Sequence, residues 1–344
     1  MKYCILGAGR TGQGMVAYLA TQGQEAGIWD RDPDRRALLR EQGVRMEGTC
    51  AGTYWPVVFD ALEQAAAQAE VLLVMTTAGG HRPLSEQLRG HLRANQVLVI
   101  FNGNMGAWEC YAVLGREARE KGAAVAETGG MLLLCDYNEA GHLFLKSVKS
   151  EMNLATIPAA DTGRVIERLR PEFPQFYPVD SVIETSLNNS NPIMHAPITL
   201  FNFTRTENGE EFGYYSAGAS PCVVSFIERA DEERCAVIRA MGAAPIPCVD
   251  IINSFWSDRY GTLLSAIRNN PAYMSGKGPK TLEYRYITED IPYGIVPITR
   301  LGAALGVPTP YLDALLTCYR GLLGDSFPAV SPDVRGFAQA AREG

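Results

Sequence analysis

Short apolar runs alternate with stretches of helical periodicity along the first half of the chain. Four runs predict strands buried on both faces, and they cover Tyr3–Leu6, Ala26–Trp29, Val71–Thr76 and Val97–Phe101. Helix-type patterns between them cover Met15–Ala20, Pro33–Gln42, Ala61–Ala69 and Leu84–Leu92. Helix-length segments between short buried strands predict a parallel sheet with crossover helices, which is the doubly wound α/β architecture.

The pattern changes near residues 170–190, after a stretch rich in proline. Strand signals then become sparse, and helical periodicity covers Ser181–Asn189, His195–Arg205, Ser220–Met241, Ile251–Arg268, Val296–Leu305 and Tyr311–Leu323. A chain of 344 residues is also longer than one hydrophobic core usually serves. We therefore predict an α/β domain over residues 1–180 and an all-α domain over residues 181–344. The closing segment, residues 329–344, fits an extra helix, a homodimer contact or a frayed end.

Composition narrows the possible partners and the compartment. The formal net charge of −7 argues against a nucleic-acid groove or an anionic membrane surface. The longest apolar runs are far shorter than the ~20 residues of a membrane span, and no signal peptide fits before the first glycine loop. Eight scattered cysteines without a C-x-x-C pair predict free thiols in a reducing cytoplasm, with no metal site. We expect small-molecule substrates.

A glycine motif follows the first strand and opens the first helix. Its glycines are Gly7, Gly9 and Gly12, and Arg10 and Thr11 lie between the last two. In a dinucleotide-binding turn these glycines allow a tight bend, a close approach of the pyrophosphate and close packing of helix on strand. The helix N-terminus adds free N–H groups for the diphosphate. These five residues are therefore predicted to bind NAD or NADP on a Rossmann-type sheet.

Two further positions bear on the cofactor. Asp30 ends the second strand eighteen residues after Gly12, where a carboxylate binds the ribose 2′-hydroxyl and repels a 2′-phosphate. This spacing favours NAD, although the adjacent Arg31 is suited to the phosphate of NADP. A second glycine turn, at Asn102 and Gly103, follows the strand Val97–Phe101. Since ligands bind beyond the carboxyl ends of parallel strands, we expect this turn to border the nicotinamide.

Candidate chemistry in the helical half lies in two segments. The first runs from Asn188 to Pro197 and places His195 near a helix start, after a polar run that includes Asn191. The second runs from Leu282 to Gly294 and contains Arg285 and Asp290. Imidazole can give and take a proton near neutral pH, and a guanidinium suits a planar carboxylate. Taken alone, an isolated histidine is more often structural than catalytic, and the second segment is more typical of a capped loop before the next helix.

Three motifs together resemble the octopine/nopaline dehydrogenase family, the opine dehydrogenases. They are the glycine loop, Asn191-Pro192-x-x-His195-x-Pro197, and Arg285-Tyr286-Ile287-x-Glu289-Asp290-Ile291-Pro292-Tyr293-Gly294. The resemblance extends over residues 3–323. It implies an NAD(P)-dependent oxidoreductase acting on CH–NH donors. Such an enzyme condenses the amine of an amino acid with a pyruvate-like 2-oxo acid and reduces the imine to an N-(carboxyalkyl)amino acid.

The resemblance also implies roles for individual residues. His195 and Asp290 correspond to the catalytic dyad, and Arg285 to the ligand of the oxo acid carboxylate. Glu127, in Ala126-Glu127-Thr128, corresponds to a glutamate that the family carries at a strand end near the amino-acid pocket. Asn191 is a further expected substrate contact. The apolar run Met131–Cys135 departs from the more polar stretch of the family and suggests a hydrophobic amine donor.

Two other functions fit parts of the pattern. One is a dehydrogenase of 2-oxo and 2-hydroxy acids that uses no amine, whose catalytic base is more often a lysine on the first helix of the helical domain. His195 in its Asn-Pro-x-x-His setting argues against that function. The other is a dinucleotide-sensing protein without turnover, which needs no converging histidine, aspartate and arginine.

Overall fold

The computed structural model describes residues 1–138, 140–255, 258–328 and 331–343. They form two compact units, Met1–Ser186 and Leu187–Glu343. The first unit therefore ends later than residue 180, and most of α7 (Val182–Leu187) belongs to it. The reason lies in side-chain bonding, because the hydroxyls of Thr185 and Ser186 both donate to Glu127 of the first unit.

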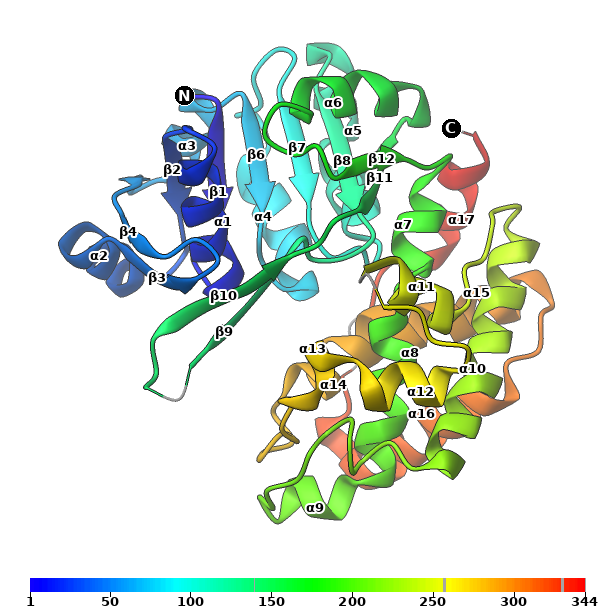
Figure 1. Cartoon of the computed structure of the whole chain (residues 1–344). Helices are drawn as coiled ribbons and strands as arrows, with labels where there is room; N and C mark the ends of the chain where they lie inside the picture. Colours follow the sequence, from blue (N-terminus) through cyan, green and yellow to red (C-terminus); the bar gives the residue numbers. More distant parts are fainter. Residues whose placement is uncertain (139, 256–257, 329–330, 344) are drawn as a thin grey trace. The chain divides into compact units, whose positions relative to one another are not determined.

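The first unit is built on an eight-stranded sheet (Figure 1). Its strands are β1 (Tyr3–Leu6), β2 (Ala26–Trp29), β5 (Val57–Val58), β6 (Val71–Val74), β7 (Val97–Ile100), β8 (Ala124–Thr128), β11 (Met152–Ile157) and β12 (Phe176–Pro178). The order is β12-β11-β8-β7-β6-β1-β2-β5, and the strands from β5 to β8 are parallel. From β5 to β8, chain order along the sheet reverses at β1, as in dinucleotide-binding folds. The predicted doubly wound sheet is confirmed.

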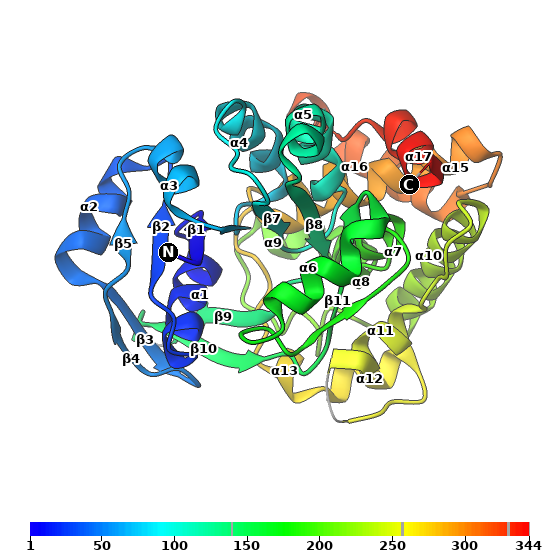
Figure 2. The same cartoon turned by 90° about the horizontal axis from the view of Figure 1, so that it is seen from above.

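Helices cover both faces of this sheet. They are α1 (Arg10–Thr21), α2 (Pro33–Gln42), α3 (Leu62–Gln68), α4 (His81–Leu88), α5 (Gly106–Lys121) and α6 (Thr162–Leu169), with short 3₁₀ turns η1 (Ala78–Gly80) and η2 (Ala159–Asp161). Figure 2 shows α1 and α6 on one face and α3, α4 and α5 on the other. The helix predicted at Leu84–Leu92 starts earlier and stops at Leu88, because Gly90 adopts φ +84°.

A four-stranded sheet, β4-β3-β10-β9, was not predicted from the sequence. It consists of β3 (Val44–Gly48), β4 (Gly52–Tyr54), β9 (Leu133–Tyr137) and β10 (Leu143–Val148), and it packs against α1. Leu133 and Cys135 are buried, and a Cβ on Gly14 of α1 would collide with the Cys135 sulfur. The apolar run Met131–Cys135 thus serves this packing, which removes the basis for predicting a hydrophobic amine donor from it.

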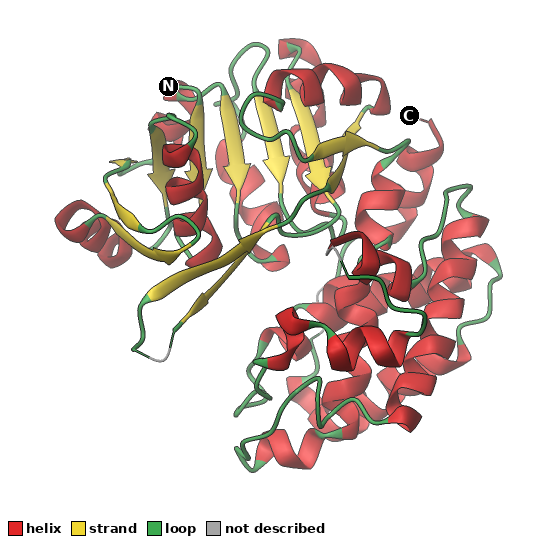
Figure 3. Cartoon of the chain, in the orientation of Figure 1, coloured by secondary structure: helices red, strands yellow, loops and turns green. Residues whose placement is uncertain are grey.

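The second unit is helical, as Figure 3 shows. It contains α8 (Ser190–Phe201), α9 (Phe203–Glu207), α10 (Pro221–Ala240), α11 (Cys248–Phe255), α12 (Leu263–Asn269), α13 (Pro271–Met274), α14 (Arg285–Thr288), α15 (Val296–Leu305), α16 (Pro310–Leu323) and α17 (Val334–Glu343), with the π-helical turn η3 (Ile291–Ile295) and the 3₁₀ turn η4 (Gly324–Ser326). Beyond one isolated bridge between Gly213 and Lys277, its described residues form no strand, so the predicted all-α domain is confirmed. Within the described part of the chain, no helix combines the length and apolar character needed to cross a membrane.

Two predicted helices are each divided in the structure. The segment His195–Arg205 splits between α8 and α9 at Asn202, whose side-chain amide donates to the carbonyls of Ile198 and Gly218. The segment Ile251–Arg268 splits between α11 and α12, and residues 256–257 lie outside the described residues. In the closing segment, α17 supports an extra helix, whereas residues 329–330 and 344 also lie outside the described residues.

His81 gives the first unit a sensitivity to acid. It is 2% exposed at the N-terminus of α4, and burial lowers its pKa from 6.5 to about 4. Between these pH values the unfolded chain binds the proton and the folded protein does not. The free energy of unfolding therefore decreases as the pH is lowered from 6.5 to about 4. The loss reaches roughly 3 kcal/mol near pH 4. We expect His81→Leu to flatten this dependence in urea titrations, and His91→Leu, at an exposed site, to leave it unchanged. Equal slopes for the wild type and His81→Leu would contradict the assignment.

Candidate active site

The glycine loop between β1 and α1 has the shape that a diphosphate requires. Gly7 adopts φ +111°, and a Cβ there would lie 2.9 Å from the carbonyl oxygen of Met75. A Cβ on Gly12 would collide with the carbonyl of Gly7, whereas a Cβ on Gly9 would meet no described atom within 4 Å. Packing of the protein therefore demands glycine at the first and third positions, and the second leaves open space beside the helix N-terminus. This fits a dinucleotide phosphate.

Residues at the start of α1 complete this loop. Arg10 and Thr11 form the first turn of the helix, and the N-cap residue Gly9 has no side chain that could cap its free N–H groups. The Arg10 guanidinium lies 2.6 Å from Asp136 of β9, with both side chains at the surface. The first-turn N–H groups thus remain for an anion, and the positive end of the helix dipole favours one.

Asp30 lies directly beneath the glycine loop and is 6% exposed. Its carboxylate accepts the N–H of Ala8 at 2.6 Å and the N–H of Asp32 at 3.0 Å, and Arg35 lies 3.4 Å away. Arg31 is exposed, as expected for a residue that follows the strand end. The acid therefore ties the loop to β2, and it lies where the ribose of a dinucleotide binds in this fold.

The turn after β7 is an unusual left-handed segment. Asn102, Gly103, Asn104 and Met105 all have positive φ angles, of +85°, +58°, +59° and +61°. Non-glycine residues rarely adopt this region, and such runs persist only where neighbouring groups hold them. The Met105 N–H donates to Ser186 Oγ at 3.2 Å, and a Cβ on Gly103 would approach the Thr185 carbonyl to 2.7 Å. Contacts with α7 therefore fix the turn that was predicted to border the nicotinamide.

In the second unit, α8 carries the predicted acid–base residue. Asn189 caps the helix, because its side-chain oxygen accepts the N–H of Asn191 at 3.0 Å. His195 lies in the next turn and is 4% exposed. Tyr214 donates to the carbonyl of His195 at 2.8 Å, and Tyr319 donates to the carbonyl of Ala196 at 2.7 Å. Pro197 lacks the N–H that would donate to the carbonyl of Ile193. The two tyrosine hydroxyls fix the neighbouring turn through the carbonyls of His195 and Ala196.

His195 and Asp290, ninety-five residues apart, form a buried pair. Nδ1 of the imidazole lies 2.7 Å from Oδ2 of Asp290, which is fully buried between α14 and η3. Burial lowers the pKa of His195, and the negative charge of Asp290 opposes that shift. The carboxylate fixes the tautomer with the proton on Nδ1, so that Nε2 carries the lone pair. The pair can therefore act as a base and, once protonated, as an acid.

Arg285 lies close to this pair at the start of α14. Its side chain is 36% exposed, and its Nε is 3.6 Å from a carboxylate oxygen of Glu289. That Nε is buried and makes no hydrogen bond to any described residue. Its positive charge also acts on the imidazole and lowers the pKa of His195. An unused donor on a guanidinium beside an acid–base group suits a substrate carboxylate.

A group of tyrosines surrounds His195, and the sequence reasoning missed it. The ring of Tyr286 lies 4.1 Å from the imidazole between centroids, and Tyr214 stacks on Tyr286 at 4.7 Å. The hydroxyl of Tyr215 lies 2.8 Å from His195 Nε2. The doublet Tyr214-Tyr215 and the motif tyrosine Tyr286 were visible in the sequence, but no periodic pattern linked them to the histidine.

Known proteins resemble the chain over nearly its whole length. A family model described as "NAD/NADP octopine/nopaline dehydrogenase, alpha-helical domain" matches residues 178–323, and a model described as "Ketopantoate reductase PanE/ApbA" matches residues 3–117. The opine dehydrogenase of Arthrobacter sp. (strain 1C) is 33% identical over 333 residues, covering 94% of this chain and 91% of the relative. The chain belongs to the opine dehydrogenase family. It is accordingly an NAD(P)-dependent oxidoreductase that acts on CH–NH donors, as predicted.

Solved structures agree on the fold of this opine dehydrogenase family member. A structure of octopine dehydrogenase with NADH and agmatine has a TM-score of 0.77 at 19% identity, covering 100% of this chain and 96% of that one. The NADP⁺-bound structure of yersinopine dehydrogenase has a TM-score of 0.74 at 13% identity and covers 100% and 98%. The first describes a protein holding NADH and the second a protein holding NADP⁺, so the fold accommodates both dinucleotides.

The Glu127 that the family resemblance assigned to an amine substrate has other partners in this structure. It is fully buried at the end of β8 and accepts hydrogen bonds from Thr185 at 2.8 Å, Ser186 at 2.6 Å and the Ala107 N–H at 2.9 Å. Burial raises its pKa, although these hydrogen bonds counteract the rise. With both carboxylate oxygens occupied, Glu127 joins the start of α5 to α7. This geometry does not fit a ligand of a substrate ammonium.

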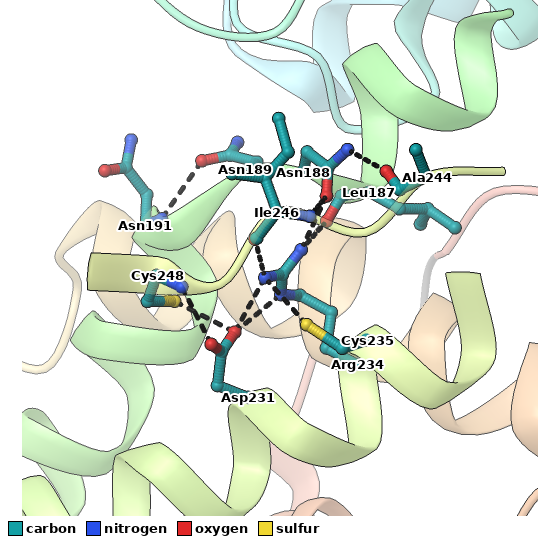
Figure 4. Close-up of polar contacts among 10 residues, drawn as sticks. All are labelled: Leu187, Asn188, Asn189, Asn191, Asp231, Arg234, Cys235, Ala244, Ile246 and Cys248. Carbon is teal, nitrogen blue, oxygen red and sulfur yellow. Dashed lines mark hydrogen bonds and ion pairs between the residues drawn. The ribbon is translucent and has the colours of Figure 1, made fainter. Parts of the chain in front are cut away.

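A buried arginine holds the start of α8, as Figure 4 shows. Arg234 of α10 is fully buried and donates to the carbonyls of Leu187 at 2.8 Å and Ile246 at 2.6 Å. It also pairs with Asp231 at 2.7 Å and reaches the side-chain oxygen of Asn188 at 3.1 Å. The signal in the sequence was an arginine on the apolar face of an amphipathic helix, three residues after an acid.

Removing the Arg234 side chain should destabilise the second unit. We expect Arg234→Met to lower the free energy of unfolding by about 3 kcal/mol or more, because Asp231 and two backbone carbonyls lose their donor. Arg229→Met is the matched control, since Arg229 lies on the same helix but pairs with Glu232 at the surface. That variant should change stability by less than about 1 kcal/mol. Equal denaturant midpoints for the two variants would show that Arg234 is dispensable.

Proposed function

We propose that the chain condenses the amine of an amino acid with a pyruvate-like 2-oxo acid and reduces the imine with NAD(P)H. The product is an N-(carboxyalkyl)amino acid. The observation that carries the proposal is the buried His195–Asp290 pair at 2.7 Å, with Arg285 on the same short segment as the aspartate. Family membership supports the reaction type, and relatives named for octopine and yersinopine support condensation with an amino acid.

Each residue has a distinct part in this reaction. His195 takes a proton from the substrate ammonium and returns it to the carbonyl oxygen that leaves as water. Asp290 holds the imidazole in one tautomer and stabilises its protonated form. Arg285 binds the carboxylate of the oxo acid through its guanidinium, and Asn191, half-buried in the first turn of α8, is proposed as a further substrate contact. The bound dinucleotide supplies the hydride.

The dinucleotide is proposed to lie on the first unit. Gly7, Gly9, Arg10, Thr11 and Gly12 would hold its diphosphate, and Asn102 and Gly103 would border the nicotinamide. Asp30 would accept the ribose hydroxyls, which favours NADH over NADPH.

The alternative reaction, reduction of a 2-oxo acid without an amine, is supported by the match of residues 3–117 to the ketopantoate reductase model. However, α8, the first helix of the second unit, carries a histidine and no lysine. Oxidation of NADH with pyruvate alone, without an amino acid, would favour this alternative.

Free thiols support the proposed cytoplasmic location. All eight cysteines are unpaired with one another, including Cys222 and Cys318 at the surface. Such exposed thiols persist in reducing compartments. A homodimer remains a prediction that light scattering can test.

Replacing the imidazole should nearly abolish turnover. We expect His195→Asn to lower kcat by about 10²-fold or more, because the proton transfers to and from substrate lose their carrier. NADH oxidation with pyruvate and a panel of amino acids measures this loss. His142→Asn is the control, since that histidine is exposed and pairs with Glu47 at the surface. Full activity of His195→Asn would remove the histidine from the mechanism.

Neutralising Asp30 should weaken the preference for NADH. Asp30→Asn keeps an acceptor for the Ala8 N–H but removes the charge that repels a 2′-phosphate next to Arg31 and Arg35. We expect the ratio of kcat/KM for NADH to that for NADPH to fall by about 10-fold. Asp32→Asn, which changes the capping residue of α2, should leave the ratio unchanged. A wild-type enzyme that prefers NADPH would contradict the assignment of Asp30.

A further inference from the structure

The nitrogen of His195 that should face substrate already has a partner in the second unit. Because Asp290 accepts the proton on Nδ1, the lone pair of the neutral imidazole is on Nε2. The Tyr215 hydroxyl lies 2.8 Å from that nitrogen and therefore donates to it. Substrate can exchange a proton with Nε2 only if Tyr215 moves away or passes the proton on.

The surroundings of Tyr215 favour the second possibility. Its side chain is buried, stacks on Tyr273 at 4.6 Å and meets the edge of Tyr214 at 5.0 Å. The half-exposed ring of Tyr286 lies against the same imidazole, with 4.1 Å between the centroids. Displacing Tyr215 would break its stacking and its hydrogen bond with His195 at once. Burial raises the pKa of Tyr215 well above its usual value, so the phenol keeps its proton and remains a donor.

The charge of Arg285 reaches the same hydroxyl. Arg285 directly precedes Tyr286 on α14, and the Tyr286 ring lies 4.1 Å from the His195 imidazole. In keeping with this position, the guanidinium lowers the pKa of both His195 and Tyr215. A 2-oxo acid whose carboxylate is bound by Arg285 has its carbonyl one bond further along. That carbonyl would therefore be presented to the Tyr215–His195 pair.

We propose that Tyr215 is a catalytic residue that relays protons between the substrate and His195 Nε2. This inference rests on the proposed function. The resulting chain of hydrogen bonds runs from Asp290 through His195 to Tyr215.

Protons are conserved when the relay runs from substrate to His195 and when it runs back. When the ammonium of the amino acid loses its proton to the Tyr215 oxygen, the Tyr215 hydroxyl proton moves to Nε2, and the phenol is restored. The free amine then forms a bond to the carbonyl carbon, and the π electrons move to the oxygen. The proton on Nε2 returns to Tyr215 while the hydroxyl proton of Tyr215 passes to that oxygen. A second proton moves from nitrogen to oxygen by the same path, water leaves, and the protonated imine remains to accept hydride.

Tyr215→Phe tests the relay during turnover, because the substitution removes only the hydroxyl. We expect kcat to fall by about 10²-fold. In mixtures of light and heavy water, the wild-type rate plotted against the deuterium fraction should give a downward-curved (bowed) line, because two protons move in one step. The residual rate of the variant should instead decrease linearly with the deuterium fraction. Tyr319→Phe is the matched control, since its hydroxyl binds the Ala196 carbonyl, and it should keep the bowed dependence. A linear dependence in the wild type, or an unchanged kcat in Tyr215→Phe, would overturn the relay.

A second measurement does not depend on the proposed reaction. In ¹⁵N-labelled protein without substrates, the Nε2 resonance of His195 should shift in Tyr215→Phe and stay in place in Tyr319→Phe. An unmoved resonance in Tyr215→Phe would overturn the relay even if the enzyme turns over. Conversely, the expected shift together with no amine-dependent oxidation of NADH or NADPH would count against the proposed reaction and leave the His195–Tyr215 contact established.

Discussion

The burial of an imidazole against a carboxylate is the interaction on which the second unit depends. His195 and Asp290 are both removed from water, and burying a carboxylate costs free energy unless its partner and hydrogen-bond geometry are good. Much of the surrounding structure meets that requirement. Tyrosine hydroxyls bind the backbone beside the histidine, and Arg234 holds the chain that leads into α8. These contacts therefore hold the backbone of α8 in place beside His195.

The same principle appears in the first unit with a different result. Glu127 is buried as deeply as Asp290, yet its carboxylate accepts bonds from two hydroxyls and a backbone N–H. A carboxylate so fully satisfied is a structural link, because its charge is spread over several donors. It also fixes Ser186, whose hydroxyl oxygen accepts the Met105 N–H and so supports the strained left-handed turn at residues 102–105. A buried carboxylate thus joins two helices in one unit, and in the other it pairs with a single imidazole.

Local patterns predicted much of the fold and part of the candidate site. The glycine loop, Asp30 and the alternation of strands and helices depend on short-range spacing, and the structure has them where the sequence placed them. The pairing of His195 with Asp290 was predicted from a family resemblance, because no periodic pattern connects residues ninety-five positions apart. Tyr215 and the role of Glu127 were not predictable, because each depends on tertiary contacts made across a helix or a sheet.

Asp290 differs from Glu127 in one further respect that bears on reactivity. Its Oδ1 is buried and has no hydrogen-bond partner among the described residues. Leaving a buried acceptor unpaired costs about 1–3 kcal/mol. However, each additional donor would draw charge away from the oxygen that faces His195 Nδ1. With Oδ1 unpaired, Asp290 bonds to His195 through Oδ2, and its negative charge favours the protonated imidazole. The unpaired oxygen therefore costs local stability and leaves the charge of the carboxylate available to His195 and to the nearby Arg285.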